Sequence, residues 1–467
     1  MTLPLDDLLG MPDLDEVRHF IPKYDQPGPR YTSYPTAPVW NEDFGETEFR
    51  QAMARARDRK LSLYVHIPFC ERLCSFCACN KTITQDPAVG GLYLDGLERE
   101  AEMLASAIGG QRRSVQLAVG GGTPTFLSEQ ELVRMCQILD THFPPEPDAE
   151  RSLEVDPRVT SRGQLEVLAE HGFNRISLGV QDFTPQVQHA INRVQSREQT
   201  EQITRDARAL SYGSVNFDLI YGLPFQTVES FDATLDQVIT LRPDRIALYS
   251  YAHVTWIVKA QRGFEKKDLP SAERKLAIML RASQRLGDAG YRFLGLDHFA
   301  LPEDELCVAA ASGDLRRNFM GYTTRAGVDL IALGPSGISE LADAYAQSER
   351  AVDPWRERVM GRSLATIRGW QLSSDDVRRK WLIQHLMCQG EVSGSAYAET
   401  FDEALTERVP DLQARLAPFV DDGLLVPEDS AFRVTPLGRL FLRVIAMSFD
   451  GYLPEPDPER PKFSRTV

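Results

Sequence analysis

Short apolar runs alternate with longer segments of helical period through the first half of the chain. The runs are rich in Val, Ile and Leu, and each ends in a polar or glycine-bearing turn. They are LSLYVHIP at 61–68, VQLAVGG at 115–121, RSLEVDP at 151–157, RISLGVQ at 175–181, VNFDLIYG at 215–222 and RIALYSYA at 245–252. Between them apolar residues recur at helical spacing, so the pattern predicts six strand–helix units in series.

Units of this kind imply right-handed crossovers and a parallel sheet, closed or partly closed as a barrel. We therefore predict an α/β fold built as a partial (β/α)6 barrel, whose chemistry gathers at the carboxyl ends of its strands. Two helix ends are also predicted. Ser128 and Glu131 have the spacing of a capping box, and Gly213 is expected to end the helix before it.

Three regions are expected along the chain. Residues 1–55 form a Pro-rich N-terminal arm with the sequence RYTSYPT, whose tyrosines either brace the fold or close over the site. Residues 56–360 form the barrel and its extension, and residues 361–467 form a mainly α-helical domain. Its helix, hairpin and helix pattern is typical of a winged helix. The domain lacks a dense basic stripe, so we expect a lid or a structural role rather than DNA reading.

Composition favours a cytoplasmic enzyme. The chain has 467 residues, 42% of them hydrophobic, and a net charge of -15. The negative charge argues against general binding to nucleic acid or anionic membranes. No apolar run is long enough to span a bilayer, and the acidic start MTLPLDDLLG lacks the basic region of a signal peptide.

Four of the seven cysteines lie in the segment HIPFCERLCSFCACNK. Cys70, Cys74 and Cys77 have CxxxCxxC spacing, which is too tight for a disulfide framework and suits thiolates that bind one cubane iron–sulfur cluster. Three thiolates leave one iron open to a substrate. Zinc remains an alternative, although no second cysteine or histidine pair follows at zinc-site spacing. The distant cysteines are most simply buried thiols in a reducing compartment.

Polar and glycine residues follow the predicted strands. GGGTPT at 120–125 is either an ordinary tight turn or a place where backbone amides approach a ligand. Glu154 and Asp218 are either solvated acids or site residues. Asp218 lies inside an apolar run, where a carboxylate needs a partner. Histidines 66, 253 and 298 are more simply hydrogen-bonded structural residues than metal ligands.

The cysteine loop after the first strand of an α/β barrel resembles the radical S-adenosylmethionine (SAM) superfamily. Within it, the chain resembles the oxygen-independent coproporphyrinogen III oxidases over nearly its whole length. The motifs that carry this resemblance are PRYTSYPTA at 29–37, YVHIPFC at 64–70, CxCNK ending at Lys81, GGGTPT, EVDPR at 154–158, GVQDF at 179–183, DLIYGLP at 218–224, YAH at 251–253, DHFA at 297–300, RNF at 317–319 and GYTT at 321–324.

The resemblance implies a [4Fe-4S] cluster on Cys70, Cys74 and Cys77 and one or two SAM molecules. The positions that match the SAM pocket are Tyr64, Phe76, Gly121, Gly122, Thr123, Glu154, Gln181, Arg193, Asp218, Ala252 and Ile338. Tyr64, Glu154 and the additional, non-ligating Cys79 are the candidate catalytic residues. Arg30, Arg316 and Arg317 are candidates for binding the propionates of a tetrapyrrole substrate, on charge and motif position.

The implied reaction takes one electron from an external donor. The reduced cluster cleaves SAM, and the resulting 5′-deoxyadenosyl radical removes hydrogen from the β-carbon of a propionate. Loss of carbon dioxide and one electron leaves a vinyl group, and two such steps convert coproporphyrinogen III to protoporphyrinogen IX in haem biosynthesis. The cofactors perform this chemistry while the protein orients the reacting carbon and excludes water. The chain is expected to act as a monomer.

Several positions depart from the family pattern. Met320 stands where Gln is usual, Thr255 where Pro is usual and Val119 where an aromatic residue is common; Pro335 and Gly337 also replace other small residues. These departures leave two alternatives: a radical enzyme acting on another tetrapyrrole, or a haem-binding chaperone. The CxCNK motif and the YTSYP arm argue against the chaperone.

Overall fold

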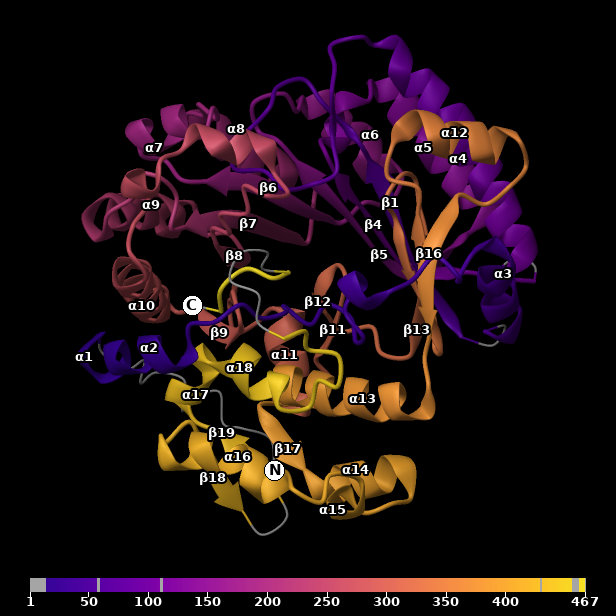
Figure 1. Cartoon of the computed structure of the whole chain (residues 1–467). Coiled ribbons are helices and arrows are strands. Elements are labelled where there is room, and N and C mark those ends of the chain that lie inside the picture. The colour runs from indigo at the N-terminus through magenta and orange to yellow at the C-terminus, as the bar shows by residue number, and fades with distance from the viewer. Residues whose placement is uncertain (1–13, 57–58, 110–111, 429–430, 456–461, 467) are drawn as a thin grey trace.

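The computed structural model describes residues 14–56, 59–109, 112–428, 431–455 and 462–466. Its main layer is a 12-stranded sheet in the order β16-β15-β14-β13-β1-β4-β5-β6-β7-β8-β10-β9 (Figure 1). The six predicted strands are β1 (Lys60–Ile67), β4 (Ser114–Gly121), β5 (Pro145–Val155), β6 (Arg175–Gln181), β7 (Ser214–Tyr221) and β8 (Arg245–Ser250). They lie side by side in chain order and pair in parallel. The predicted α/β architecture is confirmed.

The sheet is open. Its two edges are β16 (Thr366–Gln371) and β9 (Arg292–Gly295), and no strand pairing within the described residues joins them. The partly closed form of the barrel is therefore the one the chain adopts. Beyond β1 the sheet continues through β13 (Val328–Leu333), which is parallel to β1, and then through antiparallel β14 (Ile338–Glu340) and β15 (Ala344–Ser348).

Helices between the parallel strands cover the outer face of the sheet (Figure 1). They are α4 (Ala88–Ala107), α5 (Glu129–His142), α6 (Arg162–Glu170), α8 (Arg197–Ala209), α9 (Val228–Leu241) and α10 (Ala272–Asp288). The predicted capping box is present, because Ser128 Oγ accepts from the Glu131 amide and the Glu131 carboxylate accepts from the Ser128 amide. The prediction for Gly213 is wrong. The helix α8 ends at Ala209 and the chain reverses at Ser211 (φ 64°), so Gly213 only leads into β7.

Several short elements lie between β8 and the C-terminal region in the chain. They are β10 (His298–Ala300), α11 (Glu305–Ser312), β11 (Arg316–Asn318), β12 (Gly321–Thr323) and α12 (Val352–Met360). The C-terminal region consists of α13 (Ser374–Gln389), α14 (Gly394–Phe401), α15 (Leu405–Arg408), α16 (Leu412–Asp421), α17 (Pro436–Leu440) and α18 (Leu442–Met447), with a small antiparallel sheet of β17 (Glu391–Ser393), β18 (Leu425–Glu428) and β19 (Ala431–Val434).

The first part of the N-terminal arm packs along the C-terminal region, and its last helix packs against β15 and β16 (Figure 1). It contains α1 (Leu14–Val17), α2 (Ile21–Tyr24) and α3 (Glu46–Arg55), while residues 1–13 lie outside the described part. Tyr31 donates to Asp450 (3.0 Å), and Tyr34 accepts from the Gly451 amide (2.9 Å). Both tyrosines are buried, so they act as a brace. Within the described ranges, no helix is long and apolar enough to cross a membrane.

One glycine sets how closely α12 approaches α4. Trp355 of α12 is fully buried, and its indole lies over Gly96, where an added Cβ would be 2.8 Å from the ring. The indole also donates to Glu100 of α4 (3.1 Å). Gly91, on the same helix, has nothing within 4 Å of its Cβ position. Alanine at position 96 therefore tests the packing against Trp355, whereas alanine at position 91 tests helix propensity alone.

Gly96→Ala should destabilise the fold by about 1–3 kcal/mol, because the new methyl group overpacks against Trp355. The matched variant Gly91→Ala should stabilise it by about 0.5–1 kcal/mol, because alanine is the better helix former. The midpoint of urea unfolding measures both. Equal effects of the two substitutions would contradict the packing at Gly96.

Candidate active site

Two cavities meet at the carboxyl ends of the parallel strands. The outer cavity, of about 610 Å³, is lined by the cysteine loop and the glycine turn. The inner cavity, of about 450 Å³, lies along the sheet and is lined by residues such as Tyr64 and Ile338. Both are lined by Glu154, Ser177, Asp218 and Tyr249. These four residues form the boundary across which the two cavities can exchange a reacting group.

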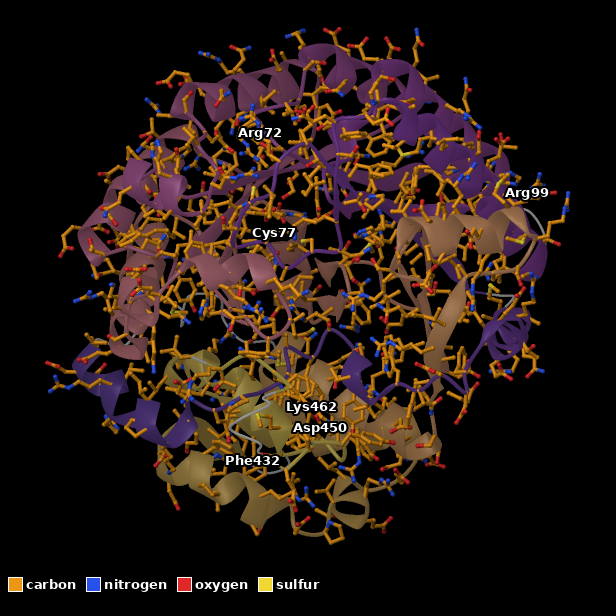
Figure 2. The ribbon with its side chains drawn as sticks, turned by 45° about the horizontal axis from the view of Figure 1, so that its top comes forward. Arg72, Cys77, Arg99, Phe432, Asp450 and Lys462 are labelled. Carbon is orange, nitrogen blue, oxygen red and sulfur yellow. The ribbon has the colours of Figure 1, made fainter. Side chains whose placement is uncertain are left out.

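The cysteine loop is held by short strands and by its neighbours. The strand β2 (Phe69–Cys70) pairs with β3 (Thr82–Ile83), which closes the loop between them. The Ser75 amide donates to the carbonyl of Ile191 (2.9 Å), which follows α7 (Pro185–Ala190). In Figure 2 Cys77 lies near the middle of the view, whereas Arg99 lies at its edge. The loop is therefore anchored both by its own short strands and by the segment that follows α7.

All four cysteines of the loop line the outer cavity. Cys70 accepts from Thr123 Oγ1 (3.4 Å), and Cys74 accepts from Arg158 (3.5 Å) and Arg193 (3.6 Å). A hydrogen bond from Cys79 lowers the pKa of Cys77 to about 6. Hydroxyl, guanidinium and thiol donors around these three sulfurs stabilise the thiolates that a metal cluster requires.

The donor set fits a cluster with an open position. Cys79 has a raised pKa, chiefly because it donates to Cys77, and a neutral thiol is a poor ligand. Within the described ranges, no three His, Cys, Asp or Glu side chains form a group that could hold a single metal ion, whereas a cubane cluster takes each thiolate at a different iron atom.

The glycine turn brings backbone against the cysteine loop. Gly121 has a φ of +113°, which favours glycine, and the Gly122 amide donates to the Ile67 carbonyl (2.7 Å). An added Cβ on Gly122 would be 2.6 Å from the Phe69 carbonyl oxygen, and one on Gly120 would be 2.7 Å from Glu154. Only glycine fits at these positions. At this turn the backbone therefore approaches the cysteine loop closely, beside the cavity. An ordinary tight turn does not require such an approach.

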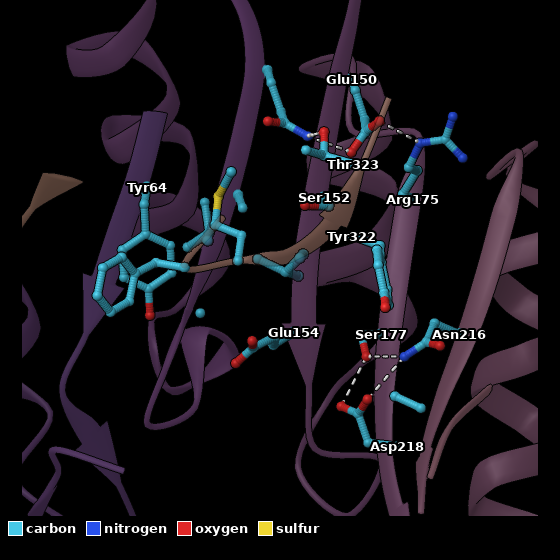
Figure 3. A pocket seen from close by; sticks show the side chains of 18 of the residues that line it. Tyr64, Glu150, Ser152, Glu154, Arg175, Ser177, Asn216, Asp218, Tyr322 and Thr323 are labelled. Carbon is cyan, nitrogen blue, oxygen red and sulfur yellow. Dashed lines mark hydrogen bonds and ion pairs between the residues drawn. The ribbon is translucent and has the colours of Figure 1, made fainter. Parts of the chain in front are cut away.

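Two carboxylates mark the boundary between the cavities. Asp218 accepts from Ser177 Oγ (2.9 Å) and from Asn216 Nδ2 (2.9 Å), as the dashed lines in Figure 3 show. Glu154, on the next strand but one, accepts from the Gly121 amide (3.2 Å). Burial, reinforced by the charge of Asp218, raises the pKa of Glu154 to about 7, and burial also raises the pKa of Asp218. Such groups gain from a ligand that donates hydrogen bonds or carries positive charge.

An ion-pair network beside Cys74 was not predicted. Asp156 is buried, and it pairs with Arg158 (2.6 Å) and Arg193 (3.1 Å). Burial disfavours its charged form, but the two guanidinium groups hold the pKa of Asp156 below its ordinary range. Asp156 and Arg158 belong to the EVDPR motif. The arginine two residues after the aspartate was the sequence signal that could have revealed this ion pair. Ser177, Asn216 and Tyr249 were also missed, and no local pattern distinguishes them from ordinary strand residues.

The predicted SAM-pocket residues lie mostly around the two cavities. Phe76, Gln181 and Arg193 line the outer cavity, as do the predicted residues of the glycine turn. Gln181 has a φ of 67°, so its backbone turns sharply at the end of β6. Ala252 lines neither cavity, and its carbonyl instead accepts from Gln261, which also donates to the Phe76 carbonyl. Ala252 therefore helps to position Phe76 through their shared partner Gln261.

The three candidate arginines differ. Arg30 pairs with Asp297 (2.7 Å) and lines a separate small pocket. Arg316 donates to the carbonyls of Gly313 and Leu315, which gives it a structural role. Arg317 is 6% exposed and lies over Tyr322, and its Nε and Nη1 atoms have no hydrogen-bond partner in the described part of the chain. Only Arg317 is a buried cation with unused donors.

The chain matches the family model of the radical SAM superfamily over residues 64–238 and that of the HemN C-terminal domain over residues 372–441. Together with the cysteine cavity and the parallel sheet, these matches define a radical SAM protein. Its class fixes the cofactors: it is an oxidoreductase that uses a [4Fe-4S] cluster and SAM.

Similar proteins of known name identify the family within this class. The chain is 43% identical over 447 residues to oxygen-independent coproporphyrinogen III oxidase of Escherichia coli (strain K12), covering 96% of this chain and 97% of the relative. It is 42% identical to the Pseudomonas aeruginosa enzyme of the same name, covering 97% and 100%. The solved structure of the E. coli coproporphyrinogen III oxidase matches with a TM-score of 0.88, 44% identity and coverage of 91% and 98%. The chain belongs to the oxygen-independent coproporphyrinogen III oxidase family.

Arg158→Gln should lower the midpoint potential of the reconstituted cluster by about 60 mV, equivalent to about 1.4 kcal/mol for one electron. The substitution removes a cationic donor from Cys74, and such donors stabilise the more negative reduced cluster. An EPR-monitored redox titration measures the change. Arg205→Gln, at an exposed arginine of α8 that lines neither cavity, is the matched control and should leave the potential unchanged. Equal potentials in the Arg158 variant and the wild type would show that the contact does not tune the cluster.

Proposed function

We propose that this chain converts two propionate side chains of coproporphyrinogen III to vinyl groups without oxygen, giving protoporphyrinogen IX in haem biosynthesis. The observation that carries the proposal is the meeting of the two cavities at Glu154 and Asp218. One cavity offers the cysteines, and the other offers room for part of a substrate. The family to which the chain belongs supports the same reaction.

The cysteine cavity has the residues that the cofactors need. Cys70, Cys74 and Cys77 would hold the cluster, with Cys79 as a neutral neighbour. Arg193 suits the carboxylate of SAM, and Glu154 and Asp218 suit its amino group and hydroxyl groups. When bound, the cluster and SAM supply the one-electron chemistry that removes hydrogen from a substrate carbon.

The chain's own residues position the substrate and exclude water. Tyr64 donates to His66 (3.1 Å), and this fixes its ring on the wall of the inner cavity. Phe76 packs with Tyr251 and Phe264 in an apolar cluster at the outer cavity. Arg317 would pair with a substrate propionate, since its buried guanidinium has donors to spare. These groups hold the reacting carbon near the Glu154 and Asp218 boundary.

The remaining partner assignments follow from the same proposal. An external one-electron donor reduces the cluster, the chain acts as a monomer, and it works in the cytoplasm. The net charge of -15 supports a protein that does not bind nucleic acid. The proposed domains are an arm at 1–55, a barrel with its extension at 56–360 and a helical region at 361–467.

One observation favours a second candidate, a radical SAM enzyme acting on another tetrapyrrole. Met320 and Val119, two of the departures from the family pattern, both line the inner cavity. A thioether in place of an amide removes hydrogen-bonding groups from the surface that would contact the substrate. Product analysis separates this candidate from the first.

Anaerobic incubation of the reconstituted protein with dithionite, SAM and coproporphyrinogen III should yield protoporphyrinogen IX and 5′-deoxyadenosine. Mass analysis of both products is the measurement. Cys74→Ala should abolish both, because it removes a cluster ligand. Cys136→Ala, at a buried thiol on α5, is the matched control and should retain both. SAM cleavage without decarboxylation of the tetrapyrrole would reject the substrate and favour the second candidate.

A further inference from the structure

A small pocket lies where the N-terminal arm, the sheet and the C-terminal helices meet. Its volume is about 60 Å³. It is lined by Arg30 of the arm, by Asp297 before β10, and by Arg439 and Arg443 of α17 and α18. Among the described residues that line it, three are arginines and Asp297 alone is acidic. The pocket therefore holds an excess of positive charge.

The ion pairs and hydrogen bonds of these side chains do not balance the excess positive charge. Asp297 is paired with Arg30 (2.7 Å) and also accepts from His298 (2.8 Å). Arg443 is 8% exposed and donates only to backbone carbonyls, those of Gly28, Pro29 and Arg465.

The Arg439 side chain borders the pocket and has no hydrogen bond or ion pair with another described residue. Arg443 is buried and Arg439 is partly buried, and neither has a carboxylate partner among the described residues.

Burial makes this arrangement costly in an empty pocket. Burial lowers the pKa of Arg443 to about 9 and also lowers that of Arg439. Buried charges in proteins are normally paired, because an unpaired charge loses its hydration without replacement. One water occupies about 10–15 Å³ of volume of this kind, so the pocket has room for a carboxylate group. An anion would supply the missing partner for both arginines.

The pocket lies directly behind the wall of the reaction site. The guanidinium of Arg30 is 6.0 Å from the ring centre of Tyr249, which lines both cavities. His298, which follows Asp297 in the chain, lines the inner cavity. Arg30 and Asp297 of the pocket are thus direct neighbours of Tyr249 and His298, which line the inner cavity.

We propose that Arg439 and Arg443, together with Arg30, form a carboxylate-binding subsite at the junction of the arm and the C-terminal helices. Its identification as a substrate subsite rests on the proposed function, which supplies propionate groups as the carboxylates. A free carboxylate anion has the same chemistry and is the other source. The subsite gives the C-terminal helices a direct part in ligand recognition.

Thermal unfolding of the purified protein in sodium propionate and in sodium chloride at equal ionic strength tests the subsite. Propionate should raise the Tm of the wild type above its value in chloride. Arg439→Gln should raise the Tm in chloride, because it removes a partly buried cation that has no carboxylate partner, and should abolish the effect of propionate. Arg433→Gln, which breaks only a partly exposed pair with Glu428, is the matched control and should keep the effect. Equal Tm values for the wild type in the two salts would overturn the subsite.

Binding of coproporphyrin III, followed by its fluorescence, identifies the source of the carboxylate. Arg439→Gln should weaken this binding about tenfold, the loss expected for one charge-assisted hydrogen bond, if a propionate of the tetrapyrrole occupies the pocket. Unchanged binding, with the propionate effect on Tm lost, would support a site for a free carboxylate and overturn the substrate subsite. Neither readout requires turnover, so the activity of the wild type tests the proposed function separately.

Discussion

The ion-pair network of Asp156 with Arg158 and Arg193 connects three separate parts of the chain. Asp156 follows β5, Arg193 lies beyond α7, and both arginines donate to Cys74 of the cysteine loop. Asp156 and Arg193 are buried and Arg158 is partly buried, so removing Asp156 leaves both guanidinium groups without their carboxylate partner. The network therefore fixes where the loop lies relative to the strand ends, and the shape of the outer cavity depends on it.

The rest of the site follows from the position of that loop. The glycine turn can approach the loop because no side chain intervenes at Gly122, and the same turn donates to Glu154 through Gly121. Glu154 and Asp218 then stand between the cofactor side and the substrate side. Their raised pKa values reflect a site that is buried and short of cations until a ligand arrives. A radical reaction needs such enclosure, because water and oxygen would quench it.

The sequence predicted the parts of this site that depend on local patterns. Strand periodicity located six of the seven parallel strands of the main sheet, but not β13, and cysteine spacing located the loop, because both patterns are properties of neighbouring residues. It did not predict that Asp156 is buried between two arginines, since an acid after a strand is usually solvated. It placed a helix end at Gly213, although Ser211 takes the left-handed turn. The pocket of Arg30 and Arg443 joins the two ends of the chain, which only the tertiary fold brings together.

The central claim is a cluster held by three cysteines with one iron open to SAM. The most direct test is the EPR spectrum of the reduced, reconstituted cluster with and without SAM, in the wild type and in Cys79→Ser. We expect SAM to change the spectrum in both proteins, because Cys79 is not a ligand and the open iron is available. A spectrum that SAM leaves unchanged, or loss of the cluster in Cys79→Ser, would indicate a closed four-cysteine site and contradict the account.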